Sequence, residues 1–368
     1  MKILVVGNWH SQVHEEPVAQ ALTTLGHRVE RFAWHTYFQP TRRPTPGLAA
    51  LNRLNYSVQN KYLLGPQFQA VNHDLIARTI QTQPDVLFVY RGTHITAATL
   101  RAIKRACPQA ILVGYNNDDP FSPHQPHWAW RHFVQAIPEY DLTLAYRQHN
   151  LDDFRGACAQ RVELLRSWFV PEANHPVTLS LEDRARFECD VVFIGHNEPD
   201  GRLELLEEIA RHQFNLRLFG PYKGFGENGW FPSIDNSPLL RHLAPVSLVW
   251  GEDYNKALCG AKVALCFLSR RNRDTYTRRC FEIPATRTML LSEYTEDLAT
   301  LYEEDREVDF FRSKEELVSK LCRYVQDDVL RQTVADAGYR RVWKDGHDVV
   351  SRMQKVIDWV KNIRLSKD

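Results

Sequence analysis

The chain has 368 residues, of which 43% are hydrophobic and 25% are charged, so it is typical of soluble globular proteins and long enough for about two domains. Its net charge of +1 excludes a general electrostatic attraction to nucleic acid. No apolar run approaches the roughly 20 residues of a membrane span, and the first strand-like residues turn directly into a glycine, unlike a signal peptide. We therefore expect a cytoplasmic protein that is at most peripheral at the inner membrane face.

The seven cysteines are scattered and none form a C-x-x-C pair. Most are flanked by apolar residues, which favours reduced, buried thiols over disulfides or a structural zinc site. The histidines His124, His127 and His132 alternate with prolines and have no acidic partner at helical spacing. They are typical of a loop, and we expect no bound metal.

In the first half, apolar strand-like runs alternate with helical patterns. The predicted strands are Lys2–Val6, His27–Ala33, Asp85–Tyr90, Ala110–Gly114, Asp141–Tyr146 and Val162–Leu165. The predicted helices are Glu15–Leu25, Tyr62–Thr82 and Ala97–Cys107, and the polar, Pro-rich stretch Thr36–Asn55 is predicted to be a loop. The best linker candidate is Trp168–Thr178, which contains two prolines.

The second half repeats this alternation. The predicted strands are Cys189–Gly195, Leu216–Phe219, Ser247–Trp250, Val263–Phe267 and Met289–Leu291. The predicted helices are Gly201–Arg211, Glu315–Val325, Asp328–Trp343 and about 348–363. Continuous apolar strands between helices indicate parallel sheets covered on both faces, so the fold class is α/β with two Rossmann-like, doubly wound domains. Such domains face each other across a cleft, with ligands at the carboxyl ends of the strands.

The segment from Tyr276 to Thr286 is the most informative stretch. It reads as an amphipathic helix that begins with Arg278 and Arg279, carries Glu282 midway, and leads into a buried strand. Arginines at a helix N-terminus bind a diphosphate, and a glutamate one turn further can accept hydrogen bonds from the vicinal hydroxyls of a ribose. The segment therefore predicts a nucleoside diphosphate pocket. A local i,i+4 ion pair between Arg278 and Glu282 is the simpler alternative.

The same half resembles a known family. The motif Arg279-Cys280-Phe281-Glu282-Ile283-Pro284-Ala285 is followed by the strand Met289–Ser292, by Phe311-Arg312-Ser313-Lys314-Glu315-Glu316-Leu317 and by His347–Arg352. Together these resemble the CgeB-like (spore maturation protein) GT-B glycosyltransferases, "glycosyl transferases group 1", over roughly residues 185–355. In the first half, residues 85–91 and 114–120 look like the corresponding segments of the family, but with lower specificity.

The resemblance implies a GT-B fold: residues 1–172 form an acceptor-binding domain, residues 180–345 bind a nucleotide-sugar donor, and a final helix at about 346–368 returns to the first domain. It also implies that Glu282 binds the ribose and that Arg278 or Arg279 faces the diphosphate. Retaining relatives often carry two glutamates seven positions apart. Here the first falls at about Thr275, with Asp274 as the nearest acid, so that motif is incomplete and the stereochemistry stays open.

Further donor-binding candidates follow two strands of the second half. Gly195 and His196 come after one strand, where a glycine permits close approach to a ligand. Tyr222 and Lys223 come after the next and are suited to stack on a sugar and contact a phosphate. Tyr276 completes the donor set, and the segment 250–254 is a candidate base-contacting loop. An ordinary strand-to-helix loop is the alternative for each.

On the first half, the loop Gly7-Asn8-Trp9-His10 follows the first strand and makes His10 a candidate catalytic residue facing the acceptor and the reacting sugar. Asp118 and Asp119 follow another strand and are candidates for the general base of an inverting transfer. A turn is the alternative, because Asn-Asn-Asp-Asp-Pro is rich in turn formers. Trp128, Trp130 and Phe133 beside Arg131 are predicted to pack in the core rather than on a lipid or sugar.

These features predict a metal-independent glycosyltransferase that moves a sugar from a nucleoside diphosphate to an unidentified acceptor, with no other cofactor and no nucleic-acid partner. One rival is a GT-B-type sugar-nucleotide epimerase. Another is a catalytically inactive nucleotide-binding assembly protein. A dehydrogenase is disfavoured because neither half carries the G-x-G-x-x-G fingerprint.

Overall fold

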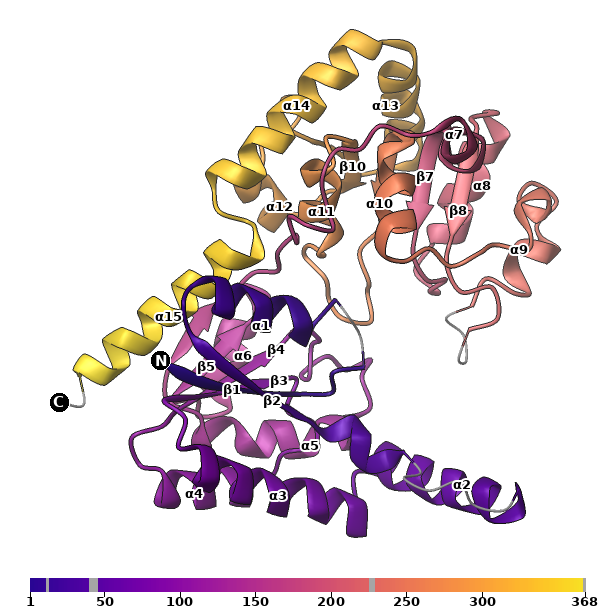
Figure 1. The fold of residues 1–368 in the computed structure, drawn as a ribbon. Coiled ribbons are helices and arrows are strands. Elements are labelled where there is room, and N and C mark those ends of the chain that lie inside the picture. Colours follow the sequence, from indigo (N-terminus) through magenta and orange to yellow (C-terminus); the bar gives the residue numbers. More distant parts are fainter. Residues whose placement is uncertain (11–12, 40–45, 225–228, 367–368) are drawn as a thin grey trace. The chain divides into compact units, whose positions relative to one another are not determined.

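The computed structural model describes residues 1–10, 13–39, 46–224 and 229–366, and it divides the chain into two compact units (Figure 1). The N-terminal unit comprises residues 1–166 together with 349–368, and the C-terminal unit comprises residues 167–348. The chain passes between them at Arg166–Ser167 and again at Asp348–Val349. The expected linker at Trp168–Thr178 belongs to the C-terminal unit, since Trp168 and Phe169 are buried there.

A six-stranded parallel sheet forms the N-terminal unit. In sheet order its strands are β2 (Arg28–Ala33), β1 (Lys2–Gly7), β3 (Val86–Tyr90), β4 (Ile111–Asn116), β5 (Leu142–Ala145) and β6 (Val162–Leu164). Its helices are α1 (Glu15–Thr24), η1 (Trp34–Phe38), α2 (Pro46–Tyr62), α3 (Pro66–Thr82), α4 (Ala97–Ala106), α5 (His127–Ala136), η2 (Ile137–Glu139), α6 (Asn150–Gly156) and α15 (Val349–Leu365).

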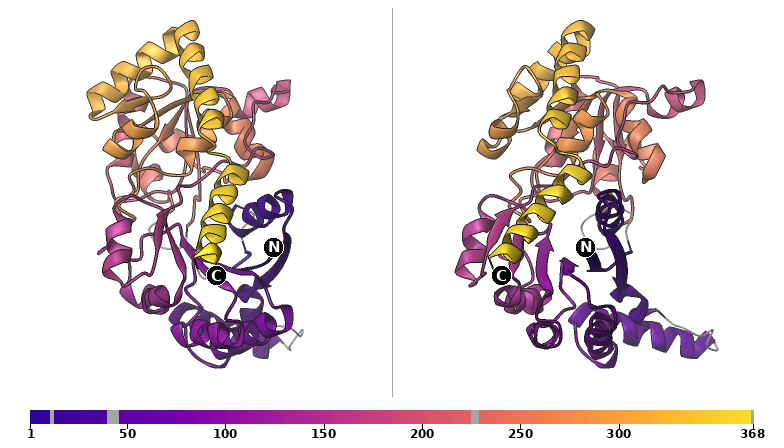
Figure 2. Two further views of the ribbon diagram at one scale, coloured as in Figure 1. Left: turned by 90° about the vertical axis from the view of Figure 1, so that its left-hand side faces the viewer. Right: turned by 60° about the vertical axis from the view of Figure 1, so that its left-hand side comes forward.

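Helices cover both faces of this sheet, as continuous apolar strands require. Helices α1 and α15 pack together on one face, while α3, α4 and α5 pack in series on the other (Figures 1 and 2). The last helix is thus part of the N-terminal unit although it ends the chain, and Arg364 near its end forms an ion pair of 2.8 Å with Asp85 beside β3.

The C-terminal unit has a five-stranded parallel sheet. In sheet order its strands are β11 (Asp309–Phe311), β10 (Met289–Glu293), β9 (Ala261–Cys266), β7 (Cys189–Ile194) and β8 (Leu216–Phe219). Its helices are α7 (Leu181–Phe187), α8 (Arg202–Arg211), α9 (Ser233–Asn236), η4 (Arg241–Leu243), α10 (Gly251–Cys259), α11 (Arg279–Ala285), α12 (Glu296–Leu301), α13 (Lys314–Gln326) and α14 (Asp328–Lys344). Two parallel sheets with helices between the strands confirm the predicted α/β class.

Several predicted elements were wrong or missed. The predicted helix Tyr62–Thr82 breaks after Tyr62, because Leu63 and Gly65 adopt positive φ values of 54° and 92° before Pro66 begins α3. The predicted loop Thr36–Asn55 contains the end of η1 and the start of α2, although residues 40–45 lie outside the described residues. The elements that were not predicted include α5, α6, α7, α10, α12 and β11.

The predicted strand Ser247–Trp250 is also wrong, since it contributes one bridge from Ser247 to Phe219 and leaves Leu248 and Trp250 exposed. Of its apolar side chains, Val249 is buried and the other two are exposed. All seven cysteines are free, four of them are buried, and Cys158 is exposed. Among the described residues no helix is long and apolar enough to cross a bilayer.

Candidate functional site

Four loops of the C-terminal unit gather at one edge of its sheet. They follow β7, β8, β9 and β10, and because all five strands are parallel, these loops leave the same carboxyl edge. This is the edge at which doubly wound sheets bind ligands. Most of the predicted donor-binding residues lie on these loops or on α11, which follows the loop after β9.

Arg279 is a cation at this edge whose side chain has no partner among the described residues. No hydrogen bond or ion pair joins its side chain to any residue in the described parts of the chain, and its Nε atom is buried without a partner. Its charge nevertheless acts on neighbouring loops, because partial burial and the positive charge of Arg279 lower the pKa of His196, which follows β7. A cation held this way is available to an anionic ligand.

Glu282 lies three residues further along α11 and is 5% exposed. Its Oε2 atom accepts a hydrogen bond of 2.6 Å from the hydroxyl of Tyr254 in α10, and its Oε1 atom lies 2.6 Å from Nε of Arg278. Burial and the adjacent carboxylate raise the pKa of Tyr254 well above its usual range, so the hydroxyl keeps its proton and donates. The local Arg278–Glu282 ion pair is therefore present, and Tyr254 is a partner that sequence reasoning did not assign.

The helix itself is shorter than expected. It begins at Arg279 rather than near Tyr276 and spans seven residues, of which Cys280 to Ala285 are all buried, so the predicted amphipathic pattern is wrong. Tyr276 is fully buried, and its hydroxyl accepts a hydrogen bond of 3.0 Å from the N–H of Ser167. The arginine side chains, rather than the dipole of a long helix, therefore provide the positive charge here.

The loop after β7 is firmly held. Arg202, which is 4% exposed, pairs with Asp200 at 2.5 Å and donates to the carbonyl oxygen of His196 at 2.7 Å. Glu198 accepts a hydrogen bond of 2.6 Å from the hydroxyl of Ser269, which follows β9. These contacts fix His196 relative to the loop after β9.

Glycines bring this loop close to its neighbour after β8. The carbonyl oxygen of Gly195 accepts a hydrogen bond of 2.9 Å from the indole of Trp230, and a Cβ atom on Gly220 would lie 2.1 Å from that same oxygen. Only glycine fits at position 220, so close backbone packing explains this residue without reference to a ligand.

A pocket of about 430 Å³ opens at the same edge. Arg270 and Arg273 line it together with Asp274 and Glu293. Burial raises the pKa of Glu293, whose carboxylate accepts a hydrogen bond of 2.5 Å from the N–H of Leu268. The pocket therefore offers cations and carboxylates side by side, which suits a ligand with both anionic and hydroxyl groups.

Two other predicted groups lie at the loop after β8. The hydroxyl of Tyr222 donates to Asp235 at 2.7 Å, and this hydrogen bond raises the pKa of Tyr222. Lys223 is exposed and lies over the ring of Phe231 at 5.8 Å. Trp250, just before α10, is 65% exposed. Lys223 and Trp250 are accessible to a ligand, whereas the Tyr222 hydroxyl has a protein partner.

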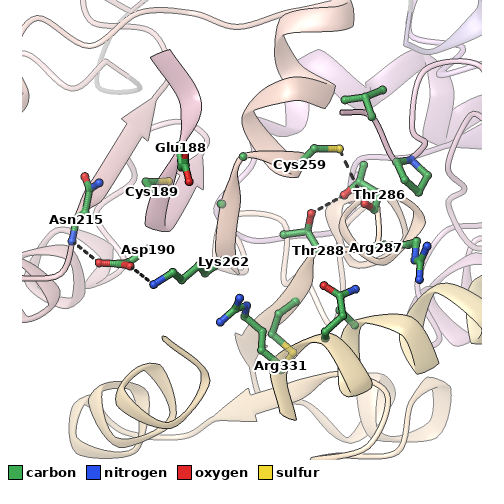
Figure 3. Close-up of a pocket in the computed structure, with 17 residues that line it drawn as sticks. Glu188, Cys189, Asp190, Asn215, Cys259, Lys262, Thr286, Arg287, Thr288 and Arg331 are labelled. Carbon is green, nitrogen blue, oxygen red and sulfur yellow. Dashed lines mark hydrogen bonds and ion pairs between the residues drawn. The ribbon is translucent and has the colours of Figure 1, made fainter. Parts of the chain in front are cut away.

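A larger cavity of about 820 Å³ lies at the opposite edge of the sheet, where the strands begin (Figure 3). Its cations already form ion pairs with protein carboxylates. The pairs are Lys262–Asp190 at 2.9 Å, Arg287–Asp336 at 2.6 Å and Arg331–Asp328 at 2.6 Å. The amino edge of a parallel sheet is not its usual ligand edge, so volume alone does not make this cavity the candidate site.

In the N-terminal unit, the two predicted aspartates follow β4 and have different environments. Asp118 forms an ion pair of 2.5 Å with Arg91, which follows β3. Asp119 is fully buried and accepts hydrogen bonds of 3.0 Å from the N–H of Phe121 and from the amide of Asn150. Neither carboxylate is a free group facing solvent.

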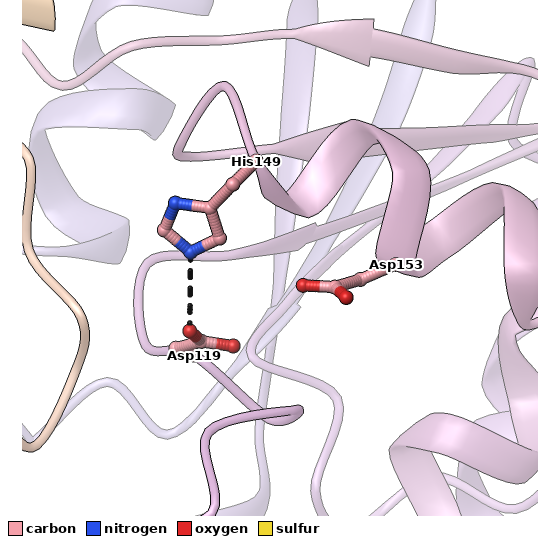
Figure 4. Close-up of side chains that lie close together, drawn as sticks. All are labelled: Asp119, His149 and Asp153. Atoms are coloured by element: carbon pink, nitrogen blue, oxygen red, sulfur yellow. Dashed lines mark hydrogen bonds and ion pairs between the residues drawn. The ribbon is translucent and has the colours of Figure 1, made fainter. Parts of the chain in front are cut away.

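Asp119 also holds a histidine that sequence reasoning missed. The Nε2 atom of His149, after β5, lies 3.3 Å from Oδ2 of Asp119, and Asp153 in α6 lies beside this pair (Figure 4). The ligand atoms of the three residues lie within 4.8 Å of one another, which is close enough to hold a metal ion. The Nδ2 atom of Asn150 donates to both carboxylates, at 3.0 Å each, and so already occupies an oxygen of each acid. The available signal was the polar run Arg147-Gln148-His149-Asn150 directly after a buried strand.

The loop after β1 is arranged around Glu15, a buried acid in the first turn of α1. Glu15 accepts a hydrogen bond of 2.8 Å from the N–H of Asn8, and a Cβ atom on Gly7 would lie 2.4 Å from its side chain. His10 is exposed, with its ring 6.2 Å from that of His35. Of the apolar group near α5, Trp130 and Phe133 are buried as predicted, whereas Trp128 is exposed.

Comparison with known proteins agrees with this geometry. A family model described as "Glycosyl transferase-like" matches residues 202–358, which include the carboxyl-edge loops after β8, β9 and β10. No curated protein sequence gives a significant match to the chain.

Solved structures match over nearly the whole chain. Sucrose-phosphate synthase (tll1590) from Thermosynechococcus elongatus aligns with a TM-score of 0.71 and 11% identity, covering 100% of both chains. Anabaena Alr3699/HepE in complex with UDP and glucose aligns with a TM-score of 0.67 and 14% identity, covering 98% of this chain and 100% of the other. A glycosyltransferase from Rickettsia africae ESF-5 gives 0.63 and 11%, covering 98% of each.

The fold is therefore that of the GT-B glycosyltransferases. The residues that the glycosyl transferase-like family model matches, 202–358, include both α11 and β11.

Proposed function

We propose that this chain is a cytoplasmic, metal-independent glycosyltransferase of the CgeB-like group, which moves a sugar from a nucleoside diphosphate to an acceptor hydroxyl. The observation that carries the proposal is Arg279, a cation with no protein partner among the described residues, at the carboxyl edge of the C-terminal sheet. The bound UDP in the Anabaena structure makes UDP-sugars the first donors to test.

On this proposal the diphosphate binds Arg279, and exposed Arg270 or Lys223 adds a second cation. Negative charge develops on the leaving phosphate as the sugar departs, and fixed cations stabilise it without a metal ion. Glu282 receives the ribose hydroxyls. A carboxylate has about four acceptor positions, and Tyr254 and Arg278 use two of those on Glu282, so the remaining positions can accept the two ribose hydroxyls.

On the acceptor side we assign the proton-accepting group to His149 rather than to either aspartate. Asp119 accepts the Nε2–H of His149 and thereby leaves its Nδ1 atom as the acceptor. The proton of the acceptor hydroxyl passes to Nδ1 while the acceptor oxygen bonds to the anomeric carbon. The bond between sugar and phosphate breaks, and its electron pair leaves with the diphosphate. Asn150 already donates to Asp119 and Asp153, which favours this role over a metal site.

Calorimetric titration with UDP, GDP and TDP tests the donor site. We expect one nucleotide to bind selectively, and Arg279→Ala to weaken it by about 1.5–3 kcal/mol, the scale of a hydrogen bond to a charged group. Arg211→Ala is the matched control, because Arg211 ends α8 and pairs with Glu208. Equal loss in both variants, or no binding of any nucleotide, would overturn the assignment.

Product analysis separates the proposed reaction from its rivals. Incubation with the selected nucleotide sugar and a panel of acceptors gives a glycosylated product if the chain is a transferase. Conversion of one nucleotide sugar into another without acceptor indicates an epimerase. Tight binding without any turnover indicates a nucleotide-binding protein that has lost catalysis.

A further inference from the structure

Helices α2 and α5 carry an exposed surface that the glycosyl-transfer site does not use. Leu54, Val58 and Tyr62 follow one another at intervals of four residues along α2, so they lie on one face of that helix. All three side chains are exposed, with Leu54 at 63%. Helix α2 extends away from the sheet of its unit (Figures 1 and 2).

The end of α2 is fastened to α5, so the two helices form one surface. The ring of Tyr62 lies 5.5 Å from that of Trp128, which is 40% exposed. The guanidinium of Arg131 in α5 donates to the carbonyl oxygen of Tyr62 at 2.5 Å and to that of Leu63 at 2.9 Å. We call the exposed apolar side chains Leu54, Val58, Tyr62, Leu64 and Trp128, with the exposed cations Arg53 and Lys61, the α2–α5 surface.

The charge around this surface is predominantly positive. Acids number 45 of 368 residues, yet the sequence has no Asp or Glu between Glu30 and Asp74, nor between Asp119 and Glu139. These two segments contain all of α2, η1 and α5. Of the helices packed against α2, only α3 contains an acid in its sequence, Asp74, and its carboxylate is bonded to Tyr37 and His73. A chain with nearly balanced charge therefore segregates cations and apolar side chains here.

We propose that the α2–α5 surface docks on a bilayer containing anionic phospholipid. Tyr and Trp prefer the boundary between headgroups and acyl chains, and Lys and Arg keep their charge among the headgroups while their stems lie along apolar surface. A second copy of the chain would bring Arg53 and Lys61 toward like charges with no acid on this surface to pair them, which disfavours a symmetric dimer. This inference stands independently of glycosyl transfer.

Sedimentation of the full chain with vesicles tests the proposal. We expect binding to phosphatidylcholine vesicles that contain phosphatidylglycerol, weaker binding to phosphatidylcholine alone, and release as salt screens the charges. Arg53→Glu combined with Lys61→Glu reduces binding by about tenfold or more, because each basic residue near an anionic surface contributes roughly 1 kcal/mol. Leu54→Ser combined with Trp128→Ser reduces binding to both kinds of vesicle.

Matched controls separate docking from changes in net charge or apolar content. Lys314→Glu with Lys344→Glu makes the same change in net charge at exposed positions of α13 and α14, and Leu181→Ser with Val329→Ser removes exposed apolar side chains elsewhere. Controls that bind like the unmodified chain support the proposal. It is overturned by absent binding to anionic vesicles, by equal losses in the controls, or by a dimer in sedimentation equilibrium that the α2–α5 substitutions dissolve.

Discussion

The hydroxyl of Tyr254 lies 2.6 Å from Oε2 of Glu282 and joins α10 to α11 beneath the loops of the C-terminal carboxyl edge. If Glu282 binds the ribose of the donor, Glu282→Ala weakens nucleotide binding by about 1.5–3 kcal/mol, the range for hydrogen bonds to a charged group. Tyr254→Phe keeps the carboxylate and weakens binding less. Calorimetry with the preferred nucleotide measures both, and unchanged affinity in Glu282→Ala would remove the ribose assignment.

Arg278 and Arg279 are adjacent, but Arg278 is paired with a protein carboxylate and Arg279 is not. We therefore expect different effects when each is removed. Arg278 neutralises the buried Glu282, so Arg278→Ala leaves a carboxylate with one partner fewer and lowers the melting temperature. Arg279 has no such partner among the described residues, so Arg279→Ala costs nucleotide affinity at nearly unchanged melting temperature. Thermal unfolding with and without nucleotide distinguishes the two, and a reversed pattern would place the phosphates at Arg278.

Sequence periodicity predicted every strand of the two sheets except β11, and it added the false strand Ser247–Trp250. Both sheets are parallel and buried on two faces, because runs such as Leu4-Val5-Val6 and Val191-Val192-Phe193 contain only apolar residues and alternate with helices. The errors came where backbone conformation or long-range burial decides. Leu63 adopts a left-handed conformation just before Gly65-Pro66, a dipeptide that marks a break but was outweighed by the helical pattern around it. In the predicted strand Ser247–Trp250, Leu248 and Trp250 remain exposed.

The residues of the candidate site could be predicted only in part, for a similar reason. Glu282 and its arginines stand in one short segment, so a local motif is enough to identify them. The contacts of Asp119 with His149 and of Glu282 with Tyr254 join residues about 30 positions apart, and only the strand order brings them together. From the sequence, Asp118 and Asp119 were equivalent, whereas burial and the Arg91 ion pair give each a different environment.

The His149–Asp119 pair predicts a defect in turnover rather than in donor binding. His149→Ala lowers the transfer rate by about 100-fold or more, the usual contribution of a positioned acid or base, while nucleotide affinity stays unchanged. Asp153→Asn is the control, since it changes the neighbouring acid and leaves the pair intact. A metal role gives another pattern: EDTA would abolish transfer and Asp153→Asn would be as damaging as His149→Ala.

Asp118 provides a separate test of the same assignment. Its carboxylate is paired with Arg91 at 2.5 Å, so Asp118→Asn removes an ion pair rather than a proton acceptor. We expect this variant to keep a transfer rate within about tenfold of the unmodified chain, well short of the loss from a missing general base. If Asp118→Asn matches the loss in His149→Ala, the general base is Asp118.

Finally, His94 predicts how stability depends on pH. The ring is buried, stacks on Trp34 at 5.2 Å, and has its Nε2 atom 2.8 Å from Oδ1 of Asn60. Burial, reinforced by the charges of Arg91 and His132, lowers the pKa of His94 from 6.5 to about 3. The folded ring therefore stays neutral at a pH where the unfolded ring takes up a proton. Its contribution is complete above pH 6.5 and is lost as the pH falls from 6.5 toward 3.

Chemical denaturation at about pH 7.5 and about pH 5.5 measures this effect. Between these values the unfolding free energy of the unmodified chain should fall by about 1.4 kcal/mol more than that of His94→Gln, because only the unmodified chain has this proton-linked difference. His73→Gln is the matched control, since it makes the same substitution at an exposed histidine beside Asp74. Parallel curves for the unmodified chain and His94→Gln would show that the ring takes up protons equally in the folded and unfolded states, and would overturn this prediction.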